Sequence, residues 1–342
     1  MEMLTTNMLL AGDLWTNIIN WFAGWIVNYG WTIIVFTILL KLVLSPLDIL
    51  QRVQSQKQSR FMSVAQPELN AIQQKYANDR EKLNAESAKI YKKYNMSMGG
   101  MCLSLLITLL VSFGVFISLF GSLRTYGDAK LYESYDKVYD AYTTTVGTDA
   151  EKIDAAKAQY EIIEKENTWL WVKNVWKADA SNVNQFIDVD TYIKWIDSEL
   201  PTDATEKEAA ITKIKAEYDI ITKAIGEEKG TQNGYFVLLI LAALVSFGAQ
   251  FLSTKMMSPK GQKMSGMNKA MMAIIPISMV IFASTSNVVF TLYIITNSVM
   301  TALISTIISL IINRKNKNKT PEEVLLKKKD IEVVEYSRNY KK

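Results

Sequence analysis

Lys41 lies inside an otherwise apolar run from Trp31 to Leu47, where a charge is costly. An ionised side chain at mid-membrane depth costs about 2.5–3.5 kcal/mol on insertion scales, so it is kept mainly where it faces water or a polar cavity. Thr37, Lys41, Ser45 and Asp48 follow one another at intervals of four, four and three residues, which places them on one face of a helix. A cation on such a face can attract carboxylates, so Lys41 is the first candidate for function.

Polar residues recur at helical spacing in three further apolar segments. Hydroxyl groups in membrane helices commonly bond to their own backbone or to a neighbouring helix, and a single stripe ordinarily arises in this way. Gln250 fits that role less well, because its carboxamide is larger and more costly to bury. Four stripes that include a lysine indicate a shared hydrophilic cavity within the bilayer. The candidate cavity residues are Thr37, Lys41, Ser45, Ser104, Thr108, Ser112, Ser246, Gln250, Thr291 and Ser298.

The number of membrane spans follows from the length of the charge-free stretches. These run from Met96 to Leu123, from Thr231 to Thr254 and from Ala270 to Asn313. The last has 44 residues, too many for one crossing of a hydrocarbon core of about 30 Å, so it must fold back near Ser284 to Asn287. Together with the segment that carries Lys41, these stretches predict five spans, at residues 31–50, 101–121, 234–254, 270–285 and 288–312.

The distribution of basic residues predicts the orientation of these spans. Residues 1–30 contain no Lys or Arg, whereas residues 51–100 carry nine against four acids and residues 313–342 carry ten against five. Residues 121–233 reverse this balance, with 14 basic and 22 acidic residues. The positive-inside rule therefore predicts an N-terminus and an acidic region outside and a cytoplasmic C-terminus. All eight Trp residues fall in the outward segments or at the outer end of a span, as in an interfacial aromatic belt.

The polar regions also show helical patterns. Residues 51–95 carry two apolar stripes, one with Phe61 and Leu69 and one with Leu83 and Ile90, which predict a helical hairpin that turns at residues 77–79. The expected organisation is an outer interfacial amphipathic helix (1–30), the first span (31–50), a cytoplasmic coiled-coil hairpin (51–100), the second span (101–121), an extracytoplasmic helical insertion (122–233), the third span (234–254), a cytoplasmic loop (255–269), the fourth span (270–285), the fifth span (288–312) and a basic cytoplasmic tail (313–342).

Local signals refine the outer segments. Thr148-Asp149-Ala150-Glu151 is predicted to be a capping box that opens a helix to about residue 166, and residues 204–226 are predicted to form another helix. Aromatic residues at helical spacing from Trp15 to Tyr29 predict an amphipathic helix on the outer surface. Trp169 to Val172 and Trp176 predict a short segment at the outer interface.

Several functions are not expected from this sequence. Leu9-Leu10-Ala11-Gly12 resembles the end of a lipoprotein signal, but Asp13 stands where a lipidated cysteine is required, so neither a lipid anchor nor a cleaved signal is expected. Cys102 is the only cysteine, so no intramolecular disulfide and no cysteine cluster for a metal are expected. The chain has no His, no nucleophile–base pair and no glycine loop for phosphate, so we expect transport without an enzyme activity or a cofactor.

The residues around Lys41 are similar to those of a known family. Asn28-Tyr29-Gly30, Lys41 and Ser45-Pro46-Leu47 resemble the first conserved span of the YidC family of membrane protein insertases. Gln66-Pro67-Glu68-Leu69 and Gly99-Gly100-Met101-Cys102-Leu103 resemble the family's next block. The resemblance extends over residues 14–120, 169–176 and 234–313, with weaker matches at Trp169-Leu170-Trp171-Val172, Gln250, Pro276 and Leu292-Tyr293.

The resemblance implies an all-α polytopic protein of the bacterial cell membrane, with five transmembrane helices around a hydrophilic groove. It implies an insertase and chaperone that moves polar outer segments of nascent membrane proteins through the groove and releases their helices into lipid. The family usually has arginine at the centre of the groove where this sequence has Lys41, and Gln250 would line the groove with it. Lysine is a compact charge that can lose its proton when desolvated, so Lys41 is expected to hold an acidic substrate less firmly than arginine.

Nascent membrane proteins are the implied partners, with the ribosome and the Sec translocon as further candidates, and no DNA partner is expected. The basic tail, with Arg314, Lys315, Lys317 and Lys319, is interpreted either as an anchor on acidic lipids or as a ribosome contact. Two alternative functions remain at this level, a small-solute or ion transporter and an assembly scaffold for membrane complexes. A transporter would be expected to show inverted repeats and midplane ion ligands, and the sequence has no internal repeat and no acid deeper in a span than Asp48.

Overall fold

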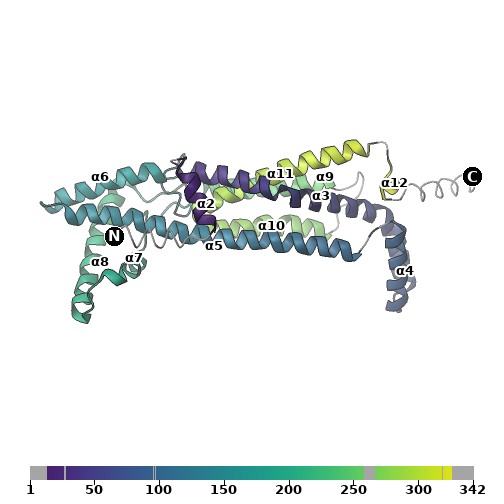
Figure 1. Cartoon of the computed structure of the whole chain (residues 1–342), viewed down its shortest axis with the longest axis horizontal. Helices are drawn as coiled ribbons and strands as arrows, with labels where there is room; N and C mark the ends of the chain where they lie inside the picture. The colour runs from purple at the N-terminus through teal and green to yellow at the C-terminus, as the bar shows by residue number, and fades with distance from the viewer. Residues whose placement is uncertain are drawn as a thin grey trace, which may run out of the picture. The chain divides into compact units, whose positions relative to one another are not determined.

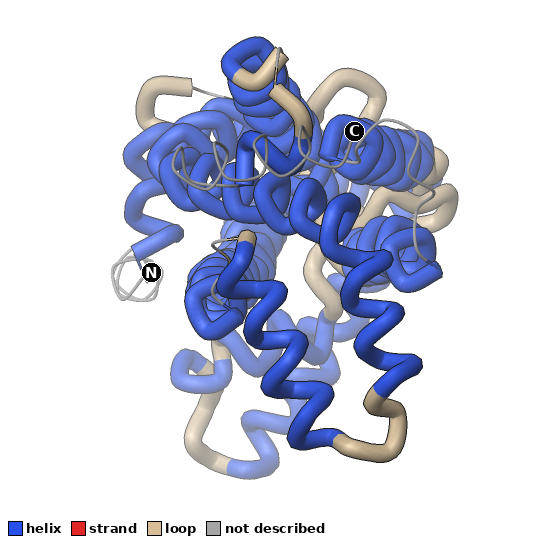
Figure 2. The backbone as a smooth tube through the Cα atoms, turned by 90° about the vertical axis from the view of Figure 1, so that its right-hand side faces the viewer, coloured by secondary structure: helices blue, strands red, loops and turns tan. Residues whose placement is uncertain are grey.

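The computed structural model describes residues 14–26, 28–94, 96, 98–257, 266–317 and 319–325. Every regular element in these residues is a helix, as the tube in Figure 2 shows. The predictions on Leu9 to Asp13, on most of the loop 255–269 and on the far end of the basic tail lie outside the described residues. The helices are α2 (Leu14–Ala23), α3 (Tyr29–Lys75), α4 (Arg80–Lys93), α5 (Met98–Thr144), α6 (Asp149–Asn167), α7 (Val189–Trp195), η1 (Asp197–Glu199), α8 (Ala204–Lys229), α9 (Val237–Met257), α10 (Gly266–Ser284), α11 (Val288–Lys315) and α12 (Pro321–Leu325).

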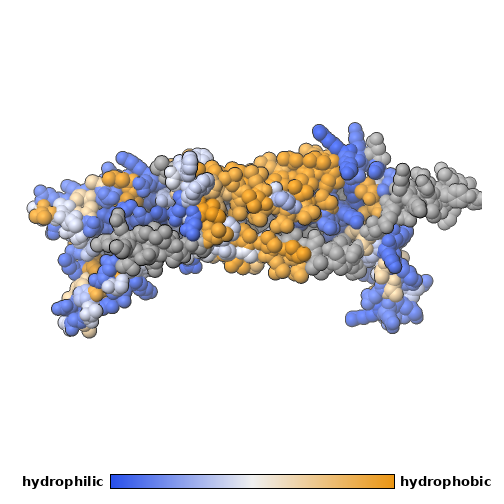
Figure 3. Space-filling view, in the orientation of Figure 1, coloured by the Kyte–Doolittle hydropathy of each residue, from blue (hydrophilic) through white to orange (hydrophobic). Residues whose placement is uncertain are grey.

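Four of these helices are long and apolar enough to cross a bilayer. They are α3, the part of α5 from residue 110 onward, α9 and α11. α10 covers the segment predicted as the fourth span. Large apolar side chains such as Val43, Leu244 and Ile311 are exposed on these helices, which suits lipid rather than water as their surroundings. Figure 3 shows hydrophobic residues over the visible side of the membrane helices and mostly hydrophilic residues over α4 and α6.

Two helices continue past the predicted membrane boundaries. α3 extends unbroken from Tyr29 to Lys75, through Pro46 and Pro67, whereas the sequence predicts a first span that ends near residue 50. Pro46 lacks an N–H group and would leave the carbonyl of Leu42 without its helical donor. The hydroxyl of Ser45 donates to that carbonyl at 2.7 Å, which compensates for the missing bond. α5 likewise continues from the second span to Thr144.

The chain divides into two compact units, and the first contains residues 1–39, 116–245 and 277–297. Part of this unit consists of the end of α5 and of α6, α7 and α8, in which α8 packs against α6 and α7 (Figure 1). The ring of Tyr135 is fully buried there, with the rings of Tyr192 and Tyr218 at centroid distances of 4.7 and 5.0 Å. α6 begins at the predicted capping box, in which Thr148 and Glu151 bond each other's backbone, so this prediction is confirmed.

The start of α3 is held by a close contact with Trp169 in the same unit. The carboxamide of Asn28 donates to the carbonyl of Thr168 at 2.6 Å and accepts from the backbone N–H of Gly30 at 3.1 Å. A β-carbon on Gly30 would lie 2.2 Å from the ring of Trp169, so only glycine fits without movement. Asn28-Tyr29-Gly30 therefore has a structural role, as the joint between α3 and the segment that begins at Thr168.

Two predictions about aromatic segments change in the structure. α2 ends at Ala23, and α3 begins at Tyr29, so the pattern from Trp15 to Tyr29 is divided between two helices. Trp176, predicted at the outer interface, is instead 3% exposed and packs against the rings of Tyr29 and Tyr126. A buried indole N–H usually has a hydrogen-bond partner, and that of Trp176 donates to the side chain of Asn167 at 3.0 Å.

The segment that contains Trp176 is fixed by two asparagines. Asn233 is fully buried, and its side-chain oxygen accepts from the backbone N–H of Asn174 at 2.7 Å. Its side-chain nitrogen donates to the carbonyls of Asn174 and Ala178 at 2.8 and 2.9 Å. The oxygen and the nitrogen of this buried carboxamide are therefore both in use, which joins residues 174–178 to the chain just before α9.

The second unit contains residues 40–115, 246–276 and 298–342. Within it, the end of α3 and α4 form a helical hairpin with a core of Phe61, Ala65, Ile90, Tyr94 and Met96, joined by Leu325 of α12. Leu69 and Ile72 pack partly against this core, as the predicted stripe indicates. α4 begins at Arg80, where the side chain of Asp79 caps the first turn.

Candidate functional site

The candidate lysine forms an ion pair within its own helix. The ammonium of Lys41 lies 2.9 Å from a carboxylate oxygen of Asp48, two helical turns further along α3. The side chains of Lys41 and Asp48 are 13% and 21% exposed, so both charges are largely shielded from solvent. The two charges of such an ion pair are costly to remove from water. Ionisable residues inside a membrane segment are therefore commonly part of a functional site.

Several hydroxyl residues of the candidate set form hydrogen bonds within the fold. Thr37 donates to the carbonyl of Ile33 at 2.6 Å, and Thr291 donates to that of Asn287 at 3.5 Å. Ser246 of α9 and Ser298 of α11 share a hydrogen bond of 3.0 Å, which joins these two helices. These bonds are the ordinary roles expected of hydroxyl groups in membrane helices.

The remaining candidate residues differ in how far they are buried. Gln250 is half-buried on α9, and its backbone carbonyl accepts from the hydroxyl of Thr254 at 2.8 Å. Ser112 is exposed on α5. The side chains of Ser104 and Thr108 lie outside the described part of the structure. Four basic candidates lie near the end of α11, namely Arg314, Lys315, Lys317 and Lys319, and all four are exposed.

Two polar residues beyond the candidate set continue the stripe of Lys41. Arg52 is 5% exposed, and its guanidinium donates to the hydroxyl of Ser253 at 2.6 Å and to that of Ser309 at 3.0 Å. Gln56 is 4% exposed, and neither atom of its carboxamide has a hydrogen-bond partner in the described structure. The signal was present in the sequence, because Arg52 and Gln56 continue the spacing of Lys41 and Asp48, but the charged residues after position 50 indicated the end of the span.

Several long apolar helices, together with a lysine–carboxylate pair inside one of them, are the features of a multi-pass helical membrane protein. The model of the 60Kd inner membrane protein family matches residues 21–319. The chain therefore belongs to this family, the YidC/Oxa1 family of membrane protein insertases.

Individual relatives match shorter parts of the chain. It is 37% identical over 107 residues to the membrane protein insertase YidC of Nitratidesulfovibrio vulgaris (strain DP4), which covers 31% of this chain and 19% of the relative. It is 40% identical over 98 residues to the YidC of Fusobacterium nucleatum subsp. nucleatum, covering 29% of this chain and 44% of the relative. It is 41% identical over 80 residues to the YidC of Clostridium tetani, covering 23% and 34%. The chain thus spans less than half the length of each of these relatives.

Proposed function

We propose that this protein is a membrane protein insertase, which moves polar segments of newly made membrane proteins across the bilayer and releases their apolar helices into lipid. The observation that carries the proposal is the ion pair of Lys41 and Asp48 inside the apolar part of α3, in a chain that belongs to this family over residues 21–319. In this proposal α3, α5, α9, α10 and α11 supply five spans around a hydrophilic groove. Lys41 and Gln250 line it, together with the hydroxyl residues of the candidate set.

A hydrophilic groove would lower the main physical barrier to insertion. A polar segment that passes through hydrocarbon leaves its backbone N–H and C=O groups without partners, at several kcal/mol each. A groove that reaches part of the way across shortens the apolar path. A membrane potential that is negative inside then favours outward movement of each negative charge by about 2.3 kcal/mol per 100 mV. The energy comes from partitioning and the potential, so no covalent step is needed.

Asp48 gives the proposed groove a built-in competitor for the substrate. A carboxylate of an acidic segment would have to displace Asp48 from the ammonium of Lys41, because the two bind the same atom. Asp48 would thereby keep the lysine compensated between substrates, when an unpaired charge would be costly. The pair would favour substrates with more than one acidic residue over substrates with a single one.

The proposed orientation places the N-terminus and residues 122–233 outside and the hairpin and C-terminus in the cytoplasm. The excess of lysine and arginine in residues 51–100 and 313–342 supports this orientation. The partners would be nascent membrane proteins, and the exposed basic residues from Arg314 to Lys319 would contact acidic lipids or the ribosome. The Sec translocon is a further candidate partner.

The proposal is tested by insertion into proteoliposomes that contain the purified protein, with substrates whose outer tails do or do not carry acidic residues. Lys41→Ala should slow insertion of acidic tails by roughly tenfold, the factor for about 1.4 kcal/mol of lost attraction, and should leave neutral tails nearly unchanged. Lys41→Arg should retain activity. Asp48→Asn should improve insertion of tails with a single acid, because the competitor is gone.

Equal amounts of each variant in the vesicles, and equal thermal unfolding, are the controls. Normal insertion of acidic tails by Lys41→Ala would show that the charge is dispensable. If vesicles with the unaltered protein insert no more substrate than empty vesicles, the insertase proposal fails as a whole.

A further inference from the structure

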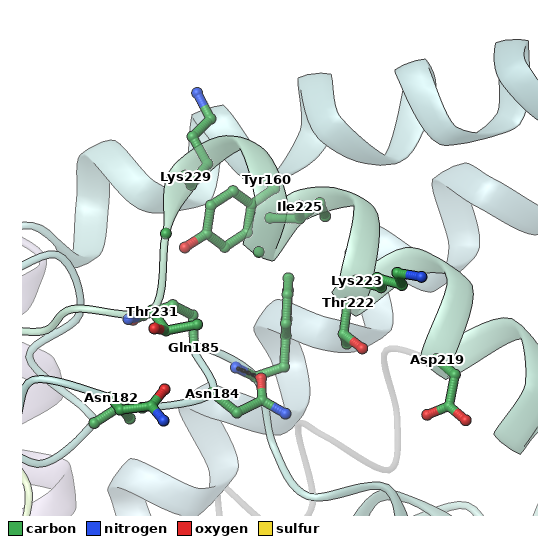
Figure 4. Close-up of a pocket in the computed structure, with 14 residues that line it drawn as sticks. Tyr160, Asn182, Asn184, Gln185, Asp219, Thr222, Lys223, Ile225, Lys229 and Thr231 are labelled. Carbon is green, nitrogen blue, oxygen red and sulfur yellow. Dashed lines mark hydrogen bonds between the residues drawn. The ribbon is translucent and has the colours of Figure 1, made fainter.

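The first unit contains a cleft of about 420 Å³ among its helices outside the membrane segments, and the proposed insertase activity makes no use of it. One wall is formed by α8 from Asp219 to Lys229 and by Tyr160 of α6, and the opposite wall is the loop segment 182–186. Figure 4 shows Asn182, Asn184 and Gln185 on this segment, across from Tyr160 and Ile225. The volume lies within the range of about 300–1,000 Å³ typical of ligand sites.

Gln185 places a buried acceptor without a partner at this cleft. The residue is 7% exposed, and its side-chain nitrogen donates a hydrogen bond to the backbone carbonyl of Gln232 at 3.4 Å. Its side-chain oxygen is buried and accepts no hydrogen bond in the described structure. A buried acceptor without a partner is unfavourable, so a donor in the cleft would stabilise the site when the side chain of Gln185, which lines the cleft, turns toward it.

Two further carboxamides lie beside Gln185. Asn184 is held in place, because its nitrogen donates to the hydroxyl of Tyr218 at 2.7 Å and its oxygen accepts from the backbone N–H of Phe186 at 3.0 Å. Asn182 is exposed and makes no hydrogen bond within the described residues, so both its donor and its acceptor are available. This loop segment therefore offers both hydrogen-bond donors and acceptors to the cleft.

Gly226 keeps the opposite wall open. It lies inside α8, where glycine destabilises the helix relative to alanine, and nothing lies within 4 Å of the position of a β-carbon. No neighbouring atom therefore requires glycine at this position. Its absent side chain leaves space in the cleft, because Gly226 is one of the residues that line it.

We propose that this cleft binds an extended stretch of polypeptide through its main-chain amide groups. A peptide N–H supplies the donor that Gln185 lacks, and a side-chain carboxamide such as that of Asn182 matches both the N–H and the C=O of a peptide unit. A sugar would instead need an open aromatic face on which to stack. The rings that line the cleft offer none, because Tyr160 and Phe186 are each 4% exposed.

Peptide binding at this cleft stands independently of the proposed insertase activity. The identity of the natural peptide rests on that proposal, under which residues 122–233 lie outside the membrane. The peptide would then be the outer segment of a protein that has just been inserted, held until its own domain folds. Binding through the main chain suits this role, because it accepts many sequences.

The test is a binding titration with the full-length protein in detergent micelles. The probe is a fluorescent octapeptide of alternating threonine and serine with blocked ends, and the second arm is a trimer of N-acetylglucosamine. Gly226→Leu should fill the cleft and weaken peptide binding at least tenfold. Gly226→Ala is the matched control, because it restores helix propensity and leaves most of the space, and it should bind the peptide like the unaltered protein.

Asn182→Ala, at an exposed position, should weaken peptide binding several-fold even if Gly226→Leu proves poorly folded. Three results would overturn the proposal: no saturable binding of the peptide, equal binding by Gly226→Leu that unfolds normally, or saturable binding of the sugar alone. Loss of peptide binding with normal insertion in proteoliposomes would separate this site from the proposed groove.

Discussion

At the scale of single residues, Arg52 holds three helices of the second unit together. Its guanidinium joins α3 to Ser253 of α9 and to Ser309 of α11, and it reaches the backbone carbonyl of Ser253 at 2.9 Å. Arg52→Ala should reduce the free energy of unfolding by about 2–3 kcal/mol, because the hydrogen bonds from a charged donor to the two serines are lost. Thermal unfolding in detergent measures this loss.

Arg80→Ala is the matched control for that measurement. Arg80 is exposed at the first position of α4, so its replacement should change the free energy of unfolding by less than about 0.5 kcal/mol. Equal effects of the two substitutions would contradict a special role for Arg52.

The sequence predicted part of this residue-scale picture. Helical spacing alone placed Lys41 and Asp48 on one face of α3, and the structure has them in contact. Spacing alone could not predict this ion pair, because the contact depends on the conformations of two flexible side chains that lie two helical turns apart. Nor could it show that Thr37 donates to its own backbone, since a hydroxyl on a polar stripe can face either way.

At the scale of elements, the joint at the start of α3 makes a clear prediction. Gly30→Ala would place a methyl group 2.2 Å from the ring of Trp169, and the resulting displacement should cost about 1–3 kcal/mol of stability. Gly121→Ala in α5 is the control, because nothing lies within 4 Å of its β-carbon position and it should be neutral or stabilising. The two melting temperatures in detergent provide the comparison, and a Gly30→Ala protein as stable as the control would show that Trp169 can move.

A local capping signal was easier to recognise in the sequence than the continuity of a helix beyond its membrane span. The capping box at Thr148 is a local signal of four residues, and α6 begins there. The first span was predicted to end near residue 50, where the composition changes, and the hairpin was predicted as a separate element, yet one helix continues from Tyr29 to Lys75. Backbone hydrogen bonds continue wherever successive residues tolerate a helix, so a change from apolar to polar side chains alone does not end it.

At the scale of the whole molecule, the proposed orientation can be tested by labelling. In a Cys102→Ser background, a cysteine at Val146, which is 99% exposed between α5 and α6, should react with a membrane-impermeant maleimide added to intact cells. A cysteine at Asn84, exposed on α4 of the hairpin, should react only after the membrane is opened. The reverse pattern would invert the proposed topology.

The class of the molecule was readable from the sequence because apolar stretches of about 20 residues or more are typical of helices that cross a bilayer. The position of its tryptophans was not. All eight were expected at an aromatic belt, but Trp169 and Trp176 are 8% and 3% exposed. A hydropathy scale gives tryptophan the same value at a membrane interface and in a protein core. Only the contacts of Trp176 within the first unit show that its ring lies in a core.

The buried carboxamide of Asn233 has a consequence for the chemical ageing of the protein. Asn233 is followed by Gly234, the neighbour that most readily lets the backbone nitrogen attack the side-chain carbonyl and release ammonia. In the folded protein that carbonyl and its nitrogen are fixed by bonds to Asn174 and Ala178, so they cannot turn toward Gly234. Deamidation at this position should therefore proceed almost entirely in unfolded molecules. Its extent, read by mass spectrometry, would record how long a preparation has spent unfolded.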